Sequence, residues 1–214
     1  MAHITDPKVI ENTSMDIIDG LLAYKRWDDK FYPIVKRVVH TTADPVFAEL
    51  LEASRDAVDA GIEALKKGCV IITDTRMAQA GINKKRLQKL NCEVRCGIDD
   101  PSIEMMAMHE SMTRAAAAIR TQSALAPRAI FAIGNAPTAL YELGELIEGG
   151  KIQPYLIIGV PVGFVGAADS KEYIKTLEAP FIVINGPKGG SNIAAGIVNA
   201  LLIEASKGGE VLCI

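Results

Sequence analysis

The sequence Phe131-Ala-Ile-Gly-Asn-Ala-Pro-Thr138 is the first of three glycine-rich turns, each of which follows an apolar run. The second is Ile157-Ile-Gly-Val-Pro-Val-Gly-Phe-Val-Gly-Ala-Ala168, and the third is Asn185-Gly-Pro-Lys-Gly-Gly-Ser-Asn192. An apolar run that ends in glycine and then opens a helical stretch is typical of a strand in a parallel sheet. Loops at the carboxyl ends of neighbouring parallel strands lie side by side, and ligands bind there. The three turns therefore predict a binding site at one edge of an α/β sheet.

Apolar runs and helical patterns alternate along the rest of the chain. Strands are expected at 34–40, 69–74, 92–96, 129–133, 156–160 and 181–184, and the main helices at 10–22, 45–51, 54–66, 102–124, 137–147, 170–177 and 191–205. This alternation implies right-handed βαβ crossovers. We therefore predict a single α/β domain over residues 1–214, a doubly wound and mainly parallel sheet with helices on both faces.

Composition narrows the class of protein. The net charge of -3 gives no overall basic field that would attract nucleic acid. No apolar run approaches the ~20 residues that a membrane-spanning helix needs, and the polar start of the chain does not resemble a secretory signal. We expect a cytoplasmic protein that uses no membrane, whose cysteines are reduced and form no metal site. These cysteines are Cys69, Cys92, Cys96 and Cys213.

The glycine turns do not match the common phosphate-binding motifs. The second turn lacks the spacing of a G-x-G-x-x-G fingerprint, and the third lacks that of a P-loop. A nucleotide-dependent enzyme therefore stays open only as an alternative. Polar residues do gather just past the strand ends, where helix N-termini would offer free N–H groups to carboxylates. The candidates for ligand contact are Asn135, Thr138, Lys188 and Ser191.

Several blocks in order along the chain resemble the precorrin-8X methylmutase family, over about residues 10–201. The blocks are Arg37-Val-Val-His-Thr-Thr-Ala-Asp-Pro45, Asp74-Thr-Arg-Met77, Thr113-Arg-Ala-Ala-Ala117, Gly134-Asn-Ala-Pro-Thr-Ala-Leu140, Pro161-Val-Gly-Phe-Val-Gly-Ala-Ala168, Ser170-Lys-Glu172 and Lys188-Gly-Gly-Ser191. The resemblance implies an isomerase of cobalamin biosynthesis. Such an enzyme moves a methyl group from C-11 to C-12 of a corrin precursor by an acid-assisted 1,5-sigmatropic shift, which gives hydrogenobyrinic acid or its cobalt form, cobyrinic acid.

His40 is the candidate catalytic acid. A methyl migration needs a rigidly held macrocycle and a well-placed proton, but no nucleophile or redox cofactor on the protein. An isolated imidazole titrates near neutral pH. His40 is expected to end a strand at the edge where the glycine turns meet, and it matches the family's acid. The alternative is a buried histidine that is satisfied by a backbone carbonyl. His3 and His109 are expected in the N-terminal tail and in mid-helix.

The substrate that the resemblance implies is a polycarboxylate, which would need cations around its rim. Arg114, on a helix face of small residues, and Arg76, after a strand end, are candidates for bidentate carboxylate contacts. Lys188 is a third. For each of these the alternative is an ordinary surface cation. Lys171 and Ser14 match family positions near the site; their alternatives are a surface charge and a helix cap. Phe164 is expected against the ring face or else in the core.

Further properties follow from the resemblance. The segment Ile10-Glu-Asn-Thr-Ser-Met-Asp-Ile-Ile18 looks closer to the anaerobic type, which would bring cobalt within its substrate and need no protein-bound cofactor. The family block usually has Arg or Asn where this chain has Pro187, so any contact of that side chain is missing and the loop is stiffer. A homo-oligomer with sites near the subunit interfaces is implied. A non-catalytic tetrapyrrole carrier, which needs no acid, remains the main alternative.

Overall fold

A six-stranded sheet forms the centre of the computed structural model, which describes residues 5–207. The strand order is β1-β6-β5-β4-β2-β3. Each neighbouring pair is parallel except β1 with β6, which is antiparallel. The strands are β1 (Leu51–Ala53), β2 (Val70–Thr73), β3 (Glu93–Arg95), β4 (Ile130–Ile133), β5 (Leu156–Gly159) and β6 (Phe181–Ile184).

Helices cover both faces of the sheet, because alternate strand residues point to opposite sides. Ile71 and Ile130 belong to a core with the helices of one face, whereas Ile72 and Phe131 pack with those of the other. The first face carries α1 (Pro7–Leu22), α2 (Tyr32–Thr42), α4 (Ala57–Lys66), α5 (Arg76–Gly81), α6 (Lys84–Lys89) and α11 (Ser191–Ser206). The second carries α8 (Arg114–Leu125), α9 (Pro137–Glu148) and α10 (Ala167–Lys175). The doubly wound fold predicted from the sequence is confirmed.

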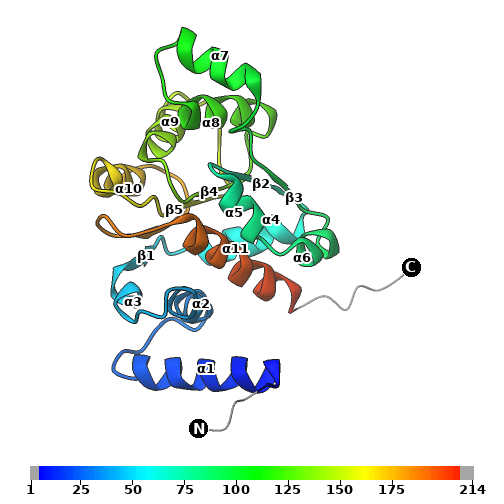
Figure 1. The fold of residues 1–214 in the computed structure, drawn as a ribbon, viewed down its shortest axis with the longest axis vertical. Helices are drawn as coiled ribbons and strands as arrows, with labels where there is room; N and C mark the ends of the chain where they lie inside the picture. Colours follow the sequence, from blue (N-terminus) through cyan, green and yellow to red (C-terminus); the bar gives the residue numbers. More distant parts are fainter. Residues whose placement is uncertain (1–4, 208–214) are drawn as a thin grey trace.

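The two remaining helices lie at the margins. Helix α3 (Val46–Leu50) follows α2 and packs on it, and α7 (Pro101–His109) packs on α8. Figure 1 shows α1 outermost, against α2, at the end of the molecule opposite α7. None of the helices within residues 5–207 has the length and apolar character that a membrane crossing requires.

The chain reverses its direction of travel across the sheet between β2 and β4. From β2 it adds β3 on one side, then returns to place β4 on the other side and continues outward through β5 and β6. The parallel strands thus have the flavodoxin-like order, in which the crevice outside the carboxyl ends at the reversal point binds ligands. In this protein the crevice lies between the residues that follow Thr73 and those that follow Ile133.

The strand expected at 34–40 is wrong, because this segment is helical and forms most of α2. Its β-branched residues favour a strand, but Ile34 and Val38, like Val35 and Val39, are four residues apart and bury one helix face. Pro33 also occupies the first turn, where proline favours a helix start. His40 therefore lies near the end of a helix and not at the end of a strand.

The long helix expected at 102–124 is in fact two helices. Ser111 has a left-handed backbone with φ of 53°, which ends α7, and Thr113 caps the new helix α8. His109 is consequently the last residue of α7, not a mid-helix residue. The short strand β1 was not predicted; it begins at Leu51, the last residue of the helix expected at 45–51. The expectations for His3 and Cys213 concern positions outside the described residues.

Candidate active site

A buried carboxylate joins the two sides of the crevice at the reversal point. Asp74 follows β2, is 1% exposed, and accepts backbone N–H bonds from Gly134 at 2.9 Å and from Asn135 and Ala136 at 2.8 Å each. Burial raises the pKa of the Asp74 carboxyl, against the lowering effect of the three N–H donors. The turn after β4 is thereby held rigidly, with the Asn135 side chain exposed at the crevice.

Two pairs of hydroxyl groups tie helix N-termini together at the same edge. Thr75, which caps α5, lies 2.8 Å from the Ser191 hydroxyl at the start of α11. Thr113, which caps α8, lies 2.8 Å from the Thr138 hydroxyl near the start of α9. The structure thus brings Arg76, Asn135, Arg114, Thr138 and Ser191, all predicted from the sequence, to one edge. Of these, Ser191 is 8% exposed and its hydroxyl is already bonded.

Three predicted cations at this edge differ in how freely they can accept a carboxylate. Arg76 donates from Nε to Asp99 at 2.6 Å and from Nη1 to Gln79 at 2.9 Å. Arg114 is exposed at the first position of α8 and, across residues 5–207, has no ion-pair partner. Lys188 lies 3.4 Å from Asp44 and 5.1 Å from the centre of the Phe47 ring. Arg114 is therefore the cation best prepared to bind an anionic ligand.

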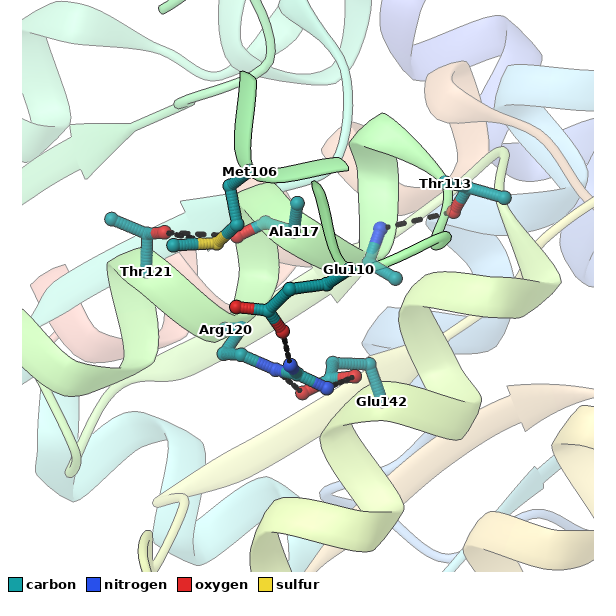
Figure 2. Close-up of polar contacts among 8 residues, drawn as sticks. Met106, Glu110, Thr113, Ala117, Arg120, Thr121 and Glu142 are labelled. Atoms are coloured by element: carbon teal, nitrogen blue, oxygen red, sulfur yellow. Dashed lines mark hydrogen bonds and ion pairs between the residues drawn. The ribbon is translucent and has the colours of Figure 1, made fainter. Parts of the chain in front are cut away.

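The helix that carries Arg114 is fixed by an ion cluster that the sequence analysis missed. Figure 2 shows the Arg120 guanidinium between two carboxylates. Its Nε and Nη2 donate to Glu142 of α9 at 2.6 and 2.8 Å, and its Nη1 donates to Glu110 after α7. Glu142 is 5% exposed, so its pairing with Arg120 is needed to offset its burial. The cluster locks α7, α8 and α9 together behind the crevice.

His40 and Ser14 line one small cavity between α1 and α2, of about 210 Å³. They are its polar side chains, and the other lining residues are Ile17, Ile18, Leu21, Val39, Ala43 and Pro45. Ser14 lies within α1, whose N-cap is Asp6, so the alternative of a helix cap is wrong. Pro45 lines this cavity, and its neighbour Asp44 pairs with Lys188. The segment that follows the His40 helix thus contacts the third glycine turn.

The exposure of Phe164 and of Lys171 decides against one alternative for each. Phe164 is 100% exposed on the loop between β5 and α10, so the alternative of a core residue is wrong. Lys171 is 0% exposed, so the alternative of a surface charge is wrong as well. Its ammonium donates to the carbonyls of Gly186 and Lys188 at 2.7 and 2.6 Å, and does not face an external ligand.

Two helix-capping residues that support the site, Thr75 and Thr113, can be recognised weakly from the sequence. Thr75 and Thr113 each precede an arginine, and each caps the helix that this arginine opens. A repeated Thr-Arg pair is a usable sign of a helix start beside a cation. Asp74 gave no comparable sign, since its three partners lie about sixty residues away along the chain.

Comparison with known proteins agrees with this arrangement. The family model described as precorrin-8X methylmutase matches residues 9–204. A cobalt-precorrin-8 methylmutase of Leptospira interrogans is 42% identical, over 94% of this chain and 95% of the relative. One from Salmonella typhimurium is also 42% identical, over 94% and 97%. A solved precorrin-8X methylmutase of Thermus thermophilus superposes with a TM-score of 0.85 at 35% identity, covering 94% of this chain and 98% of that one.

The family match spans the edge residues, the His40 cavity and all three glycine turns. A match of this extent, together with relatives that are similar along almost their whole length, establishes kinship beyond a shared α/β sheet. The chain belongs to the precorrin-8X methylmutase family, isomerases of cobalamin biosynthesis.

Proposed function

We propose that this protein converts cobalt-precorrin-8, or its metal-free counterpart, by moving a methyl group from C-11 to C-12 of the macrocycle. The observation that carries the proposal is the His40 cavity, in which an imidazole and a hydroxyl are set among apolar side chains. His40 gives a proton to, or hydrogen-bonds, a ring nitrogen beside the migrating methyl and so favours the rearranged ring. Because the reaction is an isomerisation, any proton that His40 gives returns to it by the end of the turnover.

The carboxylates of the substrate are held at the carboxyl edge of the sheet. Arg114 makes the first contact, because its guanidinium is exposed and unpaired within residues 5–207. Arg76 joins after exchanging Asp99 for a substrate carboxylate. Lys188 supplies a third cation between the edge and His40, while Asn135 and Thr138 add neutral donors near two helix starts. Phe164, which is fully exposed, lies against the ring face.

The cobalt-containing substrate is favoured. The two relatives named above carry that substrate in their names, and this chain is 42% identical to each. Cobalt then arrives inside the substrate, and the protein holds no cofactor of its own. The free thiols of Cys69, Cys92 and Cys96 suit a reducing compartment, which supports the cytoplasm as the place of action.

A second copy of the chain completes the site. The cavity of about 210 Å³ is smaller than the roughly 300–1,000 Å³ of common ligand pockets, and a corrin precursor exceeds it. Large apolar side chains are exposed around it and on the neighbouring loop, including Ile17 (59%), Leu21 (50%) and Phe164 (100%). A homo-oligomer would cover these side chains and enclose the substrate. Light scattering tests this, since full activity in a strictly monomeric sample would contradict it.

The test of the function is an anaerobic titration with cobyrinic acid or hydrogenobyrinic acid, followed by visible absorption, with turnover assayed on the precursor. His40→Ala should bind the product as the wild type does, yet lose about 10²–10⁴-fold in turnover, the usual contribution of a general acid. His109→Ala is the control, because His109 is exposed at the end of α7. Unchanged turnover in His40→Ala would remove the acid role. Binding without turnover in the wild type as well as in His40→Ala would favour a carrier, and no binding by the wild type would refute the function.

A further inference from the structure

Lys171 is a buried cation without an anion. Its side chain is fully buried in α10, and within the part of the chain that the structure describes no carboxylate lies in ion-pair distance of its Nζ. Burial lowers the pKa of Lys171 to about 8. An unpaired buried ammonium is costly unless its hydrogen bonds are satisfied. In this protein the acceptors are two backbone carbonyls, those of Gly186 and Lys188, at 2.7 and 2.6 Å.

These carbonyls belong to the third glycine turn, which is fastened to the second. Gly163 N donates to the Pro187 carbonyl at 3.0 Å, and Gly190 N donates to the Val160 carbonyl at 2.9 Å. Lys171 lies in the helix that directly follows the second turn, so its hydrogen bonds to Gly186 and Lys188 form a third link between the two turns. We call residues 160–166 and 185–190 together the two-loop platform. It carries Phe164 on one loop and Lys188 on the other.

The backbone and the side chain of Lys188 have different partners. The carbonyls on either side of Pro187 both accept from the buried Lys171, and the Lys188 side chain contacts Asp44 and Phe47. Asp44 lies beside Pro45, which lines the His40 cavity. A line of direct contacts thus runs from the interior of α10 through the platform to the helix of the acid.

We propose that Lys171 is a positioning residue, which holds the two-loop platform so that Lys188 and Phe164 face the substrate. It does not itself touch the substrate. The catalytic part of this inference rests on the proposed function, whereas the effect on the platform does not.

The experiment compares three variants of the full-length protein by amide hydrogen exchange and by steady-state kinetics. Lys171→Met removes the donors and leaves two carbonyls buried without partners. Lys171→Arg restores a charged donor. Lys67→Met, at an exposed lysine after α4, controls for the loss of a charge.

In Lys171→Met, exchange at the Gly163 and Gly190 amides should accelerate at least about tenfold, while the β4 amides of Ile130–Ile133 stay protected. Its kcat should fall by about ten- to a hundredfold with a smaller change in KM, because misplaced groups weaken the transition state most. Lys171→Arg should recover most of both effects, and Lys67→Met should match the wild type.

Three results would overturn the inference: wild-type exchange at both platform amides in Lys171→Met, equal acceleration in β4, or wild-type kcat despite a loosened platform. If Lys171→Met does not fold, Lys171→Gln replaces it. Its amide is a shorter, uncharged donor, so a smaller acceleration at the same two amides is expected, and wild-type exchange there would equally overturn the inference. A wild-type protein that binds no corrin would remove the proposed function and leave the exchange result standing.

Discussion

Gly189→Ala tests the close contact between the two loops of the platform. An added methyl group at Gly189 would overlap the Val160 carbonyl oxygen and come within 2.6 Å of the Pro161 oxygen. Both are backbone atoms, so no side-chain rotation relieves the clash. Ordinary contact begins at 3.4 Å, so relieving the Pro161 overlap alone requires the loops to separate by about 0.8 Å, and relieving the closer Val160 overlap requires more. That movement would lengthen the Gly163–Pro187 and Gly190–Val160 hydrogen bonds, now 3.0 and 2.9 Å, beyond useful range.

The expected loss of stability is at least about 3 kcal/mol. Overpacking costs roughly 1–3 kcal/mol, and each weakened backbone hydrogen bond adds about 1 kcal/mol. For a chain of this size, about 3 kcal/mol lowers Tm by roughly 6–12 °C. Turnover should fall further than the folded fraction does, because the same movement displaces Phe164 and Lys188.

Thermal unfolding followed by circular dichroism measures the effect, with product binding measured beside it. Gly20→Ala is the matched control, because no atom lies within 4 Å of its added methyl group and it sits in helix α1. It should stabilise the protein by about 0.5–1 kcal/mol. If Gly189→Ala melts within about 1 °C of the wild type and keeps its activity, the loops are not packed as described and the reasoning fails.

Three further predictions concern charges. Arg114→Ala should weaken product binding by about 10–150-fold, which corresponds to the loss of one hydrogen bond to a charged group. Arg76→Ala should weaken it less, because Arg76 must first leave Asp99. Equal affinities of the two variants in an absorption titration would contradict this. Arg120→Ala leaves the nearly buried Glu142 unpaired and should lower the free energy of unfolding in urea by about 3–5 kcal/mol. Arg128→Ala is the control: it removes a surface guanidinium 4.9 Å from the Tyr155 ring and should lower the free energy of unfolding by under about 1 kcal/mol. The folded protein releases the Lys171 proton near its pKa of about 8, but the unfolded chain keeps it to about 10.5. The free energy of unfolding of the wild type minus that of Lys171→Met should therefore rise by up to about 3 kcal/mol between these pH values, and a flat difference would show that this lysine is not buried as a cation.

Most of the sheet could be predicted from the sequence because β2, β4, β5 and β6 are short apolar runs, each ended by Asp, Asn or glycine. Five of the six strands lie where strands were expected, and β1 was missed because three residues carry too little pattern. The segment 34–40 is a helix although its β-branched composition favours a strand, because its buried apolar side chains are four residues apart. Spacing reflects which face is buried, so it decides between helix and strand.

The candidate site was predictable where a side chain follows a strand end, as Asn135 and Arg76 do. The environments of Asp74 and Lys171 could not be predicted, because the backbone groups that they bond are brought close only by the sheet topology. A lysine on an early turn of a helix is usually solvated, and only the packing of the third glycine turn over α10 buries Lys171. Family resemblance identified the residue as important but not what it does.

The hydrogen bond to the Pro187 carbonyl determines which substitutions this loop can accept during evolution. The platform is joined through peptide groups, and proline keeps its carbonyl oxygen while it gives up only an N–H. Position 187 can therefore exchange arginine, asparagine or proline without altering these backbone contacts, while any side chain at Gly189 forces the two loops apart. A library randomised over residues 185–191 should accordingly return functional clones diverse at 187 and uniform at 189. Mutational freedom in this loop follows the backbone contacts and not the distance to the chemistry.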